Sequence, residues 1–298
     1  DMTGLWNLTR RNIKLFFRDR GMFFTSLITP MILLVLYSTF LANVYENSFR
    51  ASMPPGFETA DGVIDAVVGG ELVSSLLAVS CVTVAFCCNM LMVQDRVTGV
   101  RHDFVTSPVR RGTLAVSYYA ATLVSTLIVC FAATAVSLIY LHAVGWYMSV
   151  SDVFLLILDV LLLVLFGTAL SSIVNIPLRT QGQISAVGTV VSAGYGFVCG
   201  AYMPISSFSE GLQHVISFLP GTYGTSLLRN HVLRGVFAEM ETTGFPPEVM
   251  TGIRDSIDCN LYFFGHSVPI GMMYLILGGS VLLTVTVYVL ICAARRNK

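Results

Sequence analysis

Long stretches of the 298-residue chain contain no Asp, Glu, Lys or Arg and are apolar on every face. About 20 helical residues cross a bilayer core about 30 Å thick, so such stretches predict membrane-spanning helices. The strands of a membrane barrel would instead alternate apolar and polar residues over about ten positions. The pattern therefore predicts an all-α integral membrane protein with six spans, at approximately 22–44, 72–93, 114–141, 153–176, 183–203 and 268–293.

The composition agrees with this pattern, since 55% of the residues are hydrophobic, 11% are charged and the mean hydropathy is +0.76. Ordinary soluble domains carry about 25% charged residues, so this chain encodes too little polar surface for a water-soluble globule. We therefore exclude a secreted disulfide scaffold, a disordered protein and a free nucleic-acid binder, and we expect lipid as the main solvent. The net charge of zero says nothing about a polyanionic partner.

Basic residues gather on one side of the predicted membrane. Thirteen of the 17 Lys and Arg lie in the terminal segments and in the loops after spans two and four, whereas the other side holds Arg50, Arg229, Arg234 and Arg254. Most carboxylates, Glu71 and Asp258 among them, fall on that second side. Cytoplasmic loops carry the excess of Lys and Arg, so we expect a multi-pass protein of the cell membrane with both termini in the cytoplasm. Basic residues also interrupt residues 1–20, which excludes a signal peptide.

Residues 5–18 form an amphipathic pattern before the first span. At 100° per residue, one arc is apolar and the other carries the cations; the apolar arc holds Leu5, Trp6, Leu8, Ile13, Leu15, Phe16 and Phe17, and the basic arc holds Arg10, Arg11, Lys14 and Arg18. This pattern predicts an interfacial helix with its cations toward anionic headgroups, ending at a break at Gly21. Such a helix either only orients the first span or relays motion from a cytoplasmic partner.

The loop between spans two and three, residues 95–111, is longer than a turn needs to be. Val97, Val100 and Phe104 recur at helical spacing between charged flanks, and Pro108 would end the helix. The loop is either a docking surface or a solvated helix closed by a proline turn.

The stretch 204–267 before the last span is only half polar. Residues 209–219 and 222–236 are apolar enough to dip into the outer leaflet, and Pro220 and Gly221 separate them. Irregular backbone at membrane depth is tolerated only where protein buries it or water reaches it, so we predict two re-entrant helices at the outer mouth of a path. Residues 238–258 would form a small extracellular cap.

Motifs for chemistry are missing from the sequence. It contains no G-x-x-x-x-G-K-[ST] phosphate loop, no H-E-x-x-H and no G-x-S-x-G. The five histidines are scattered, and six of the seven cysteines lie in apolar stretches, with Cys259 outside them, so we predict no metal site, disulfide framework or catalytic set. Asp159 is the one carboxylate inside a span and is either an ion relay or a residue close to the outer interface.

Uncharged polar residues gather toward the cytoplasmic ends of the predicted spans; they are Asn89, Gln94, Asn175, Gln181 and Gln183. Such side chains either form hydrogen bonds between helices or wet an inward-facing cavity.

Several motifs, in this order along six spans, resemble those of a known family. Asp95-Arg96-x-x-Gly99 leading to Ser107-Pro108-Val109-Arg110 resembles the cytoplasmic-loop signature of type 2 ATP-binding-cassette (ABC) exporter permeases. The segment that precedes the re-entrant helices in that family is similar to Gly200-Ala201-Tyr202-Met203-Pro204, Phe218-Leu219-Pro220-Gly221-Thr222-Tyr223 and Leu228-Arg229. Asp95 departs from the family, which more often has Glu at this position. The run is most similar to the drug and lipid efflux branch, which includes the daunorubicin-type permeases.

The resemblance implies an organisation for the whole chain. Residues 1–20 would contain the connecting helix, and residues 21–298 would form the six-helix transmembrane domain, with a coupling helix in 95–111 and re-entrant helices and a cap in 204–267. Two permease chains, identical or homologous, would pair around a path lined largely by spans two and five. A separate ABC ATPase would bind ATP and Mg, and this chain would hold no cofactor.

The same resemblance names the residues expected at three places. The coupling helix would dock on the ATPase through Asp95, Arg96, Gly99, Arg101, His102, Asp103 and Phe104. The connecting helix would act through Trp6, Arg10, Arg11, Lys14 and Arg18. The re-entrant gate would contain Tyr202, Pro204, Leu219, Pro220 and Tyr223.

The resulting hypothesis is a permease that moves hydrophobic or amphipathic compounds outward, driven by its ATPase. An alternative is the export of a lipid-linked polysaccharide or a teichoic-acid-like polymer, which aromatic rings would favour; Tyr118, Tyr119, Tyr140, Trp146 and Tyr147 are available. A membrane-embedded transferase or hydrolase would need a converging catalytic set, and none can be placed. An ion-coupled carrier would need internal repeats and membrane charges.

Overall fold

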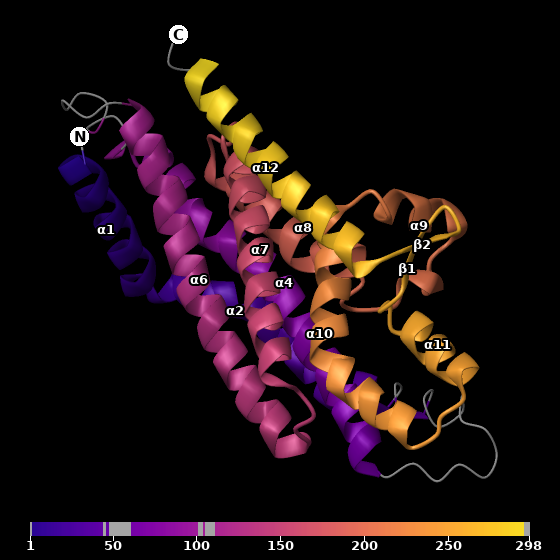
Figure 1. Ribbon diagram of the computed structural model, residues 1–298. Helices are drawn as coiled ribbons and strands as arrows, with labels where there is room; N and C mark the ends of the chain where they lie inside the picture. Colours follow the sequence, from indigo (N-terminus) through magenta and orange to yellow (C-terminus); the bar gives the residue numbers. More distant parts are fainter. Residues whose placement is uncertain (1, 44–45, 48–60, 101–103, 105–110, 295–298) are drawn as a thin grey trace.

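A computed structural model describes residues 2–43, 46–47, 61–100, 104 and 111–294. The described chain is a bundle of long helices with a smaller group of short elements at one end (Figure 1). The long helices are α1 Met2–Arg18, α2 Arg20–Leu36, α4 Asp61–Val97, α6 Arg111–Val144, α7 Val150–Asn175, α8 Gln181–Val198, α10 Pro220–Thr242 and α12 Ile270–Ala294. The prediction of an all-α membrane protein is thereby confirmed.

The length and hydropathy of the helices test part of the prediction of six spans. Four helices, α4, α6, α7 and α12, are long and apolar enough to cross a membrane, and a fifth span results if the bent pair α1 and α2 counts as one. A π-helical turn, Tyr37–Leu41, continues α2 beyond Leu36. Helix α8 has only 18 residues and begins with a polar turn, so its role as a further span stays a prediction.

The break between α1 and α2 lies at Asp19, where the chain bends by 70°. The Asp19 side chain accepts a hydrogen bond from the backbone N–H of Met22 at 3.1 Å, which caps the N-terminus of α2. The predicted break at Gly21 is therefore wrong by two residues, because a capping carboxylate rather than glycine ends the first helix.

Helix α4 lies at the centre of the bundle and packs against α2, α6, α7, α8 and α10. Of its most apolar stretch of 18 residues, 89% is buried inside the protein. The corresponding value for α12 is 17%, so α12 presents most of its apolar surface outward. Small residues allow α4, α7 and α10 to approach closely. A Cβ on Gly167 of α7 would lie 2.8 Å from the Cys81 carbonyl oxygen of α4, and one on Gly224 of α10 would lie 2.4 Å from Leu163.

The group of short elements contains a 3-10 turn Ile205–Ser207, α9 Glu210–Ile216, α11 Pro247–Ser256 and the strands β1 Leu261–Phe263 and β2 His266–Val268. The strands pair antiparallel, with Leu261 opposite Val268, and Phe264 and Gly265 turn the hairpin with φ values of 47° and 83°. Helices α9 and α10, on either side of Leu219, match the predicted re-entrant pair in position. The hairpin was not predicted, because strands of three residues give no measurable alternation.

Candidate functional site

A groove runs along the bundle between α2 and α8, with α4 as its floor. Its volume is about 1000 Å³. The groove is lined by Asp19, Gly21, Met22, Thr25, Ile28, Thr29, Ile32, Leu33, Leu36 and Phe40 of the α2 segment, Cys87, Met90 and Gln94 of α4, and Gln181, Ile184, Ser185, Gly188, Thr189, Ser192, Ala193, Phe197 and Tyr202 in and just after α8. An apolar cavity with few polar groups is the usual form of a site for a small organic molecule.

The two ends of the groove differ in chemistry. Asp19, Gln94 and Gln181 lie at the end where α2 and α8 begin, and Phe40, Phe197 and Tyr202 lie at the end where these helices finish. A second cavity of about 420 Å³ shares Asp19, Gln94 and Gln181 with the first and extends to Arg11 and Asp95. The polar end of the groove therefore continues toward the predicted connecting and coupling helices.

Arg11 and Asp95 join α1 to the inner end of α4. The Arg11 guanidinium donates to both Asp95 carboxylate oxygens, at 2.6 and 3.3 Å, and the Tyr118 hydroxyl of α6 donates to the same carboxylate at 2.6 Å. Arg11 also lies 5.0 Å from the centre of the Phe104 ring, within cation–π distance. These contacts join α1, α4 and α6 to one another, and they join α1 to Phe104.

Arg96 and Gly99 shape the loop that follows α4. One Arg96 guanidinium nitrogen donates to the carbonyl oxygens of Asn175, Ile176 and Leu178 at 2.7 to 3.1 Å, where it covers the C-terminal end of α7. A cation is well placed there, because it offsets the partial negative charge at the C-terminal end of a helix. Gly99 has φ of +83°, a conformation in which glycine is favoured over other residues.

The residues predicted for the coupling helix therefore differ in their surroundings. Asp95 is only 5% exposed and Arg96 contacts α7, so both hold the inner end of the bundle together. Phe104 is half-buried beside Arg11, while Arg101, His102 and Asp103 lie outside the described residues. The docking of this loop on a partner stays a prediction.

The predicted face of α1 is partly wrong. The side of α1 that packs on the bundle contains Thr9, Asn12 and Phe16, whereas Trp6 is 66% exposed, and its predicted contact with lipid stays a prediction. Arg11 faces Asp95 instead of solvent, because a carboxylate inside the chain competes for it. Arg10, Lys14 and Arg18 are exposed, as the basic arc predicts.

The predicted gate residues occupy two places. Tyr202 lines the groove, Pro204 precedes the 3-10 turn, and Leu219 caps the N-terminus of α10, with Pro220 as the first helical residue. Tyr223 is buried and donates a hydrogen bond to the Ser217 carbonyl at 2.5 Å. These side chains therefore stabilise the junction between α9 and α10 and the end of α8.

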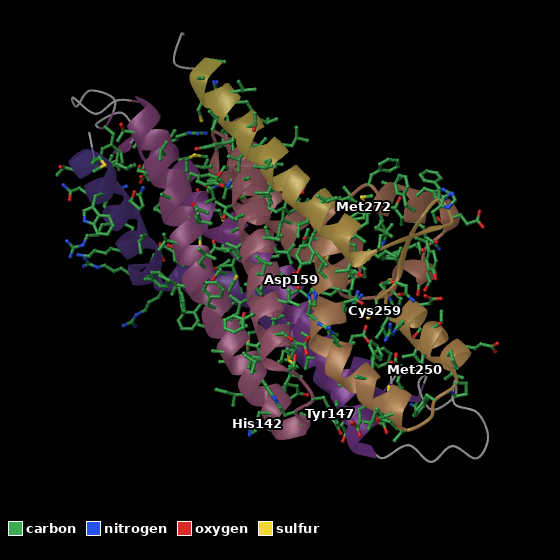
Figure 2. All side chains as sticks on the ribbon, in the orientation of Figure 1. His142, Tyr147, Asp159, Met250, Cys259 and Met272 are labelled. Atoms are coloured by element: carbon green, nitrogen blue, oxygen red, sulfur yellow. The ribbon has the colours of Figure 1, made fainter. Side chains whose placement is uncertain are left out.

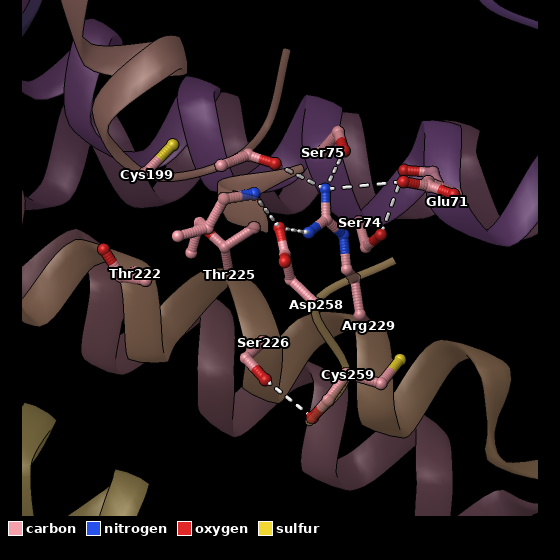
Figure 3. A network of polar contacts seen from close by, with 12 residues as sticks. Glu71, Ser74, Ser75, Cys199, Thr222, Thr225, Ser226, Arg229, Asp258 and Cys259 are labelled. Carbon is pink, nitrogen blue, oxygen red and sulfur yellow. Dashed lines mark hydrogen bonds and ion pairs between the residues drawn. The ribbon is translucent and has the colours of Figure 1, made fainter. Parts of the chain in front are cut away.

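A buried ionic network around Arg229 of α10 was missed by sequence reasoning (Figure 3). Arg229 is 1% exposed and contacts Asp258 at 3.4 Å, Glu71 at 3.6 Å, the Ser75 hydroxyl at 3.1 Å and the Gly200 carbonyl at 2.7 Å. Burial raises the pKa of the Asp258 carboxyl, and the neighbouring guanidinium opposes that shift. The sequence signal was the charge itself, since a single Arg in an apolar segment needs partners when it is buried.

Asp159 belongs to a second buried cluster, at the middle of the bundle (Figure 2). Its carboxylate contacts His231 Nδ1 of α10 at 2.5 Å and accepts a hydrogen bond from the Tyr274 hydroxyl of α12 at 2.6 Å. His231 and Asp159 therefore join α10 to α7, and Tyr274 adds α12 to the same cluster. Asp159 is fully buried within the protein, and its two interpretations, an ion relay or a residue close to the outer interface, both stay predictions.

Uncharged polar residues serve both predicted purposes. Asn89 of α4 donates to the hydroxyls of Ser171 and Ser172 of α7, whereas Gln94 and Gln181 line the groove. The five rings suggested for a polymer path do not line the groove; Tyr118 is bound to Asp95, and Tyr119 stacks on Tyr288 at 5.4 Å. No group of three metal-ligating side chains occurs within the described residues.

Fold and groove together define an α-helical membrane protein with a lateral apolar cavity. Residues 3–233 match the family model described as ABC-2 type transporter, which spans most of the chain. The chain therefore belongs to the ABC-2 type transporter family. No curated protein matches it.

Membership in this family establishes the general function of the chain. An ABC-2 membrane domain is a transmembrane permease component without a nucleotide-binding site of its own, and the family implies a partnership with an ATP-binding subunit. The sequence contains no phosphate loop, which agrees with nucleotide binding by a separate subunit.

Proposed function

We propose that this chain is the permease of an ABC exporter that moves hydrophobic or amphipathic compounds outward, in the manner of the drug and lipid efflux branch. The groove between α2 and α8 carries this proposal. Its apolar middle would accept the apolar part of a cargo, and its polar inner end would stay wet where the cargo enters. No comparable support exists in the described residues for a polymer path, because the groove lacks the rings assigned to it.

A second permease chain, identical or homologous, would complete the groove. The lining helices expose a row of large apolar side chains beside the cavity, including Ile28, Ile32 and Phe40 of the α2 segment and Phe197 of α8. A contiguous exposed apolar surface next to a cavity is suited to protein contact or cargo contact. Two such halves facing each other would enclose a path in the plasma membrane, and both chain termini would lie in the cytoplasm.

ATP hydrolysis on the separate subunit, with Mg bound there, would drive the cycle. The loop 95–111 would contact that subunit, and the Arg11, Asp95 and Tyr118 contacts would pass its movement to α1, α4 and α6. Changing Arg101 and Phe104 together to Ala should reduce the recovery of the ATPase with the purified permease. Undiminished recovery and transport would contradict this docking site.

The test of the groove uses proteoliposomes that contain the permease and its ATPase. Ala193 is exposed and lines the groove, so an Ala193→Trp ring would fill part of the cavity. We expect ATP-driven uptake of amphipathic dyes into inside-out vesicles to fall about tenfold or more, since a misplaced group of this size obstructs binding. Leu283→Trp, on the exposed face of α12, is the matched control and should leave uptake unchanged.

A further inference from the structure

The turn that leaves α8, Gly200 to Ile205, closes the aromatic end of the groove. It carries Tyr202, whose ring lies 5.0 Å from the Phe197 ring. A Cβ on Gly196 would lie 2.3 Å from the Tyr202 ring, which shows how closely the ring packs on the last turn of α8. The position of Tyr202 therefore depends on how this turn is held.

Both ends of the turn are held by one buried ion pair. Arg229 donates to the Gly200 carbonyl at 2.7 Å, and the Asp258 carboxylate accepts from the Ile205 backbone N–H at 2.9 Å. Arg229 and Asp258 are joined at 3.4 Å (Figure 3). Gly200 has φ of +76°, and a Cβ there would lie 3.2 Å from the Asp258 carboxylate, so the turn fits this pair only with glycine.

The same guanidinium is bound to the central helix. Arg229 reaches Glu71 and Ser75 of α4, at 3.6 and 3.1 Å, and α4 continues without a break from these residues to Asp95 at its other end. A rigid helix with contacts at both ends can carry a displacement from one end to the other. A shift of α4 relative to α10 would therefore change which partners Arg229 can hold.

We infer that Arg229 is a positioning residue that holds the turn 200–205, and with it Tyr202, at the closed outer end of the groove, and that movement of α4 releases this turn. The inference rests on the proposed function in one respect only, that the groove is the path of the cargo.

The chemistry of arginine suits this position. A planar guanidinium has five donors directed into several sectors, so it can bind a carbonyl, a hydroxyl and carboxylates from different elements at once. Lysine would keep the charge but offers a single nitrogen. Arg234, five residues further along α10, contacts Asp152 at 3.4 Å and has a side chain that is 62% exposed, so it serves as a matched control.

The experiment measures how readily the turn opens. Ala201 lies in the turn and is 3% exposed, so an Ala201→Cys thiol reports its opening without removing Tyr202. Cys292 would first be changed to Ser, because the other six native cysteines are buried. The permease, assembled with its ATPase in nanodiscs, is then treated with a water-soluble maleimide.

We expect Arg229→Met to raise the labelling rate of Ala201→Cys about tenfold or more, because opening of the turn no longer breaks ionic contacts. Arg229→Lys should give an intermediate rate, and Arg234→Met should match the parent. Arg229→Met should also keep ATP hydrolysis but lose dye transport. Equal labelling rates in the parent and in Arg229→Met would overturn the inference.

Two further outcomes keep the inference separate from the proposed function. Faster labelling with unchanged transport would support the positioning role and contradict the groove as the path. If Arg229→Met fails to assemble, the variant Arg229→Met with Glu71→Gln and Asp258→Asn removes the unpaired buried charges. That variant should also label faster, and an unchanged rate in it would overturn the inference.

Discussion

The two faces of α4 are built differently. Toward α7 and α10, Leu77, Val160 and Leu163 are fully buried, and polar groups such as Asn89 find partners across the interface. Toward α2 and α8, the same helix borders a cavity of about 1000 Å³. The first face is packed along its length, whereas on the second face α2 and α8 separate beside Cys87, Met90 and Gln94 and leave the groove open.

The difference follows from residue size and position. Between α4 and α7, a glycine lets the backbones meet and larger side chains fill the space around it, as at Gly167. Helix α8 is also rich in small residues, but a Cβ on Gly182 or Gly194 would meet nothing within 4 Å. On the same helix, a Cβ on Gly188 would lie 2.7 Å from the end of the Met90 side chain of α4, so small residues on α8 serve both close contact and open space, and composition alone does not reveal which of the two occurs.

The sharpest test of this comparison replaces with leucine Gly167, which packs on α4, and Gly194 of α8, which meets no neighbouring atom. Gly167→Leu should destabilise the chain by about 3 kcal/mol, because its Cβ would lie 2.8 Å from the Cys81 carbonyl oxygen and rigid backbone cannot yield. Gly194→Leu has free space and should leave stability almost unchanged. Thermal unfolding of the detergent-solubilised chain, followed by size exclusion, measures both.

Gly194→Leu adds a functional readout to the same pair. If a second chain covers α8, this variant should unfold like the parent and yet pair poorly and transport less. Equal loss of stability in the two variants would show that the faces do not differ as described.

The next largest effect concerns the inner end, where α1 joins the packed face. Asp95→Ala should cost about 2 kcal/mol, because Arg11 and Tyr118 lose a shared charged acceptor in a buried site. We expect less ATPase to be recovered with this variant and transport to fall. Asp95→Glu keeps the carboxylate and should retain most of both.

Lys14→Ala is a matched control on the same helix, since Lys14 is exposed. It should leave stability and ATPase recovery unchanged. An Asp95→Ala chain that assembles and transports like the parent would show that this contact is dispensable.

The sequence predicted the packed side of the fold better than its polar contacts. Apolar stretches predicted α6, α7 and α12 to within three residues of their observed bounds, because membrane length imposes them, whereas α4 begins at Asp61, eleven residues before the predicted start. The count of charges placed Arg229 and Glu71 on the outer side, and residues 222–236 were predicted to dip into the outer leaflet, but a single sequence does not show that Arg229 meets Glu71 and Asp258. In the structure both residues are buried.

The candidate site was predictable only in outline. Asp95 and Arg96 were predicted to dock on the ATPase, which stays a prediction, but their partners Tyr118 and Asn175 lie on other helices, and a single sequence does not give those distances. The groove depends on how α2 and α8 are placed around α4. Nothing in the local pattern of either helix encodes that placement.

A smaller effect is expected from Asp159→Asn. The amide still accepts the hydrogen bond from Tyr274 but loses the charge opposite His231, so we expect a loss of about 1 kcal/mol in stability. Because the carboxylate connects α7, α10 and α12 away from the groove lining, transport should keep its pH profile between about pH 6 and pH 8. A changed pH profile in proteoliposomes would instead assign Asp159 to an ion relay.

The smallest expected effect concerns Cys259, which lies on the packed side beside the Arg229 network (Figure 2). Burial raises the pKa of its thiol to about 12, and at about pH 8 only about one part in ten thousand would be thiolate, the form that reacts. In the folded chain, maleimide should therefore label the half-buried Cys292 well before Cys259, and both should react equally after unfolding. Mass spectrometry of the labelled peptides measures the order. Rapid labelling of Cys259 at neutral pH would mean that the packed face opens as readily as the groove, and the contrast between the two sides of α4 would then fail.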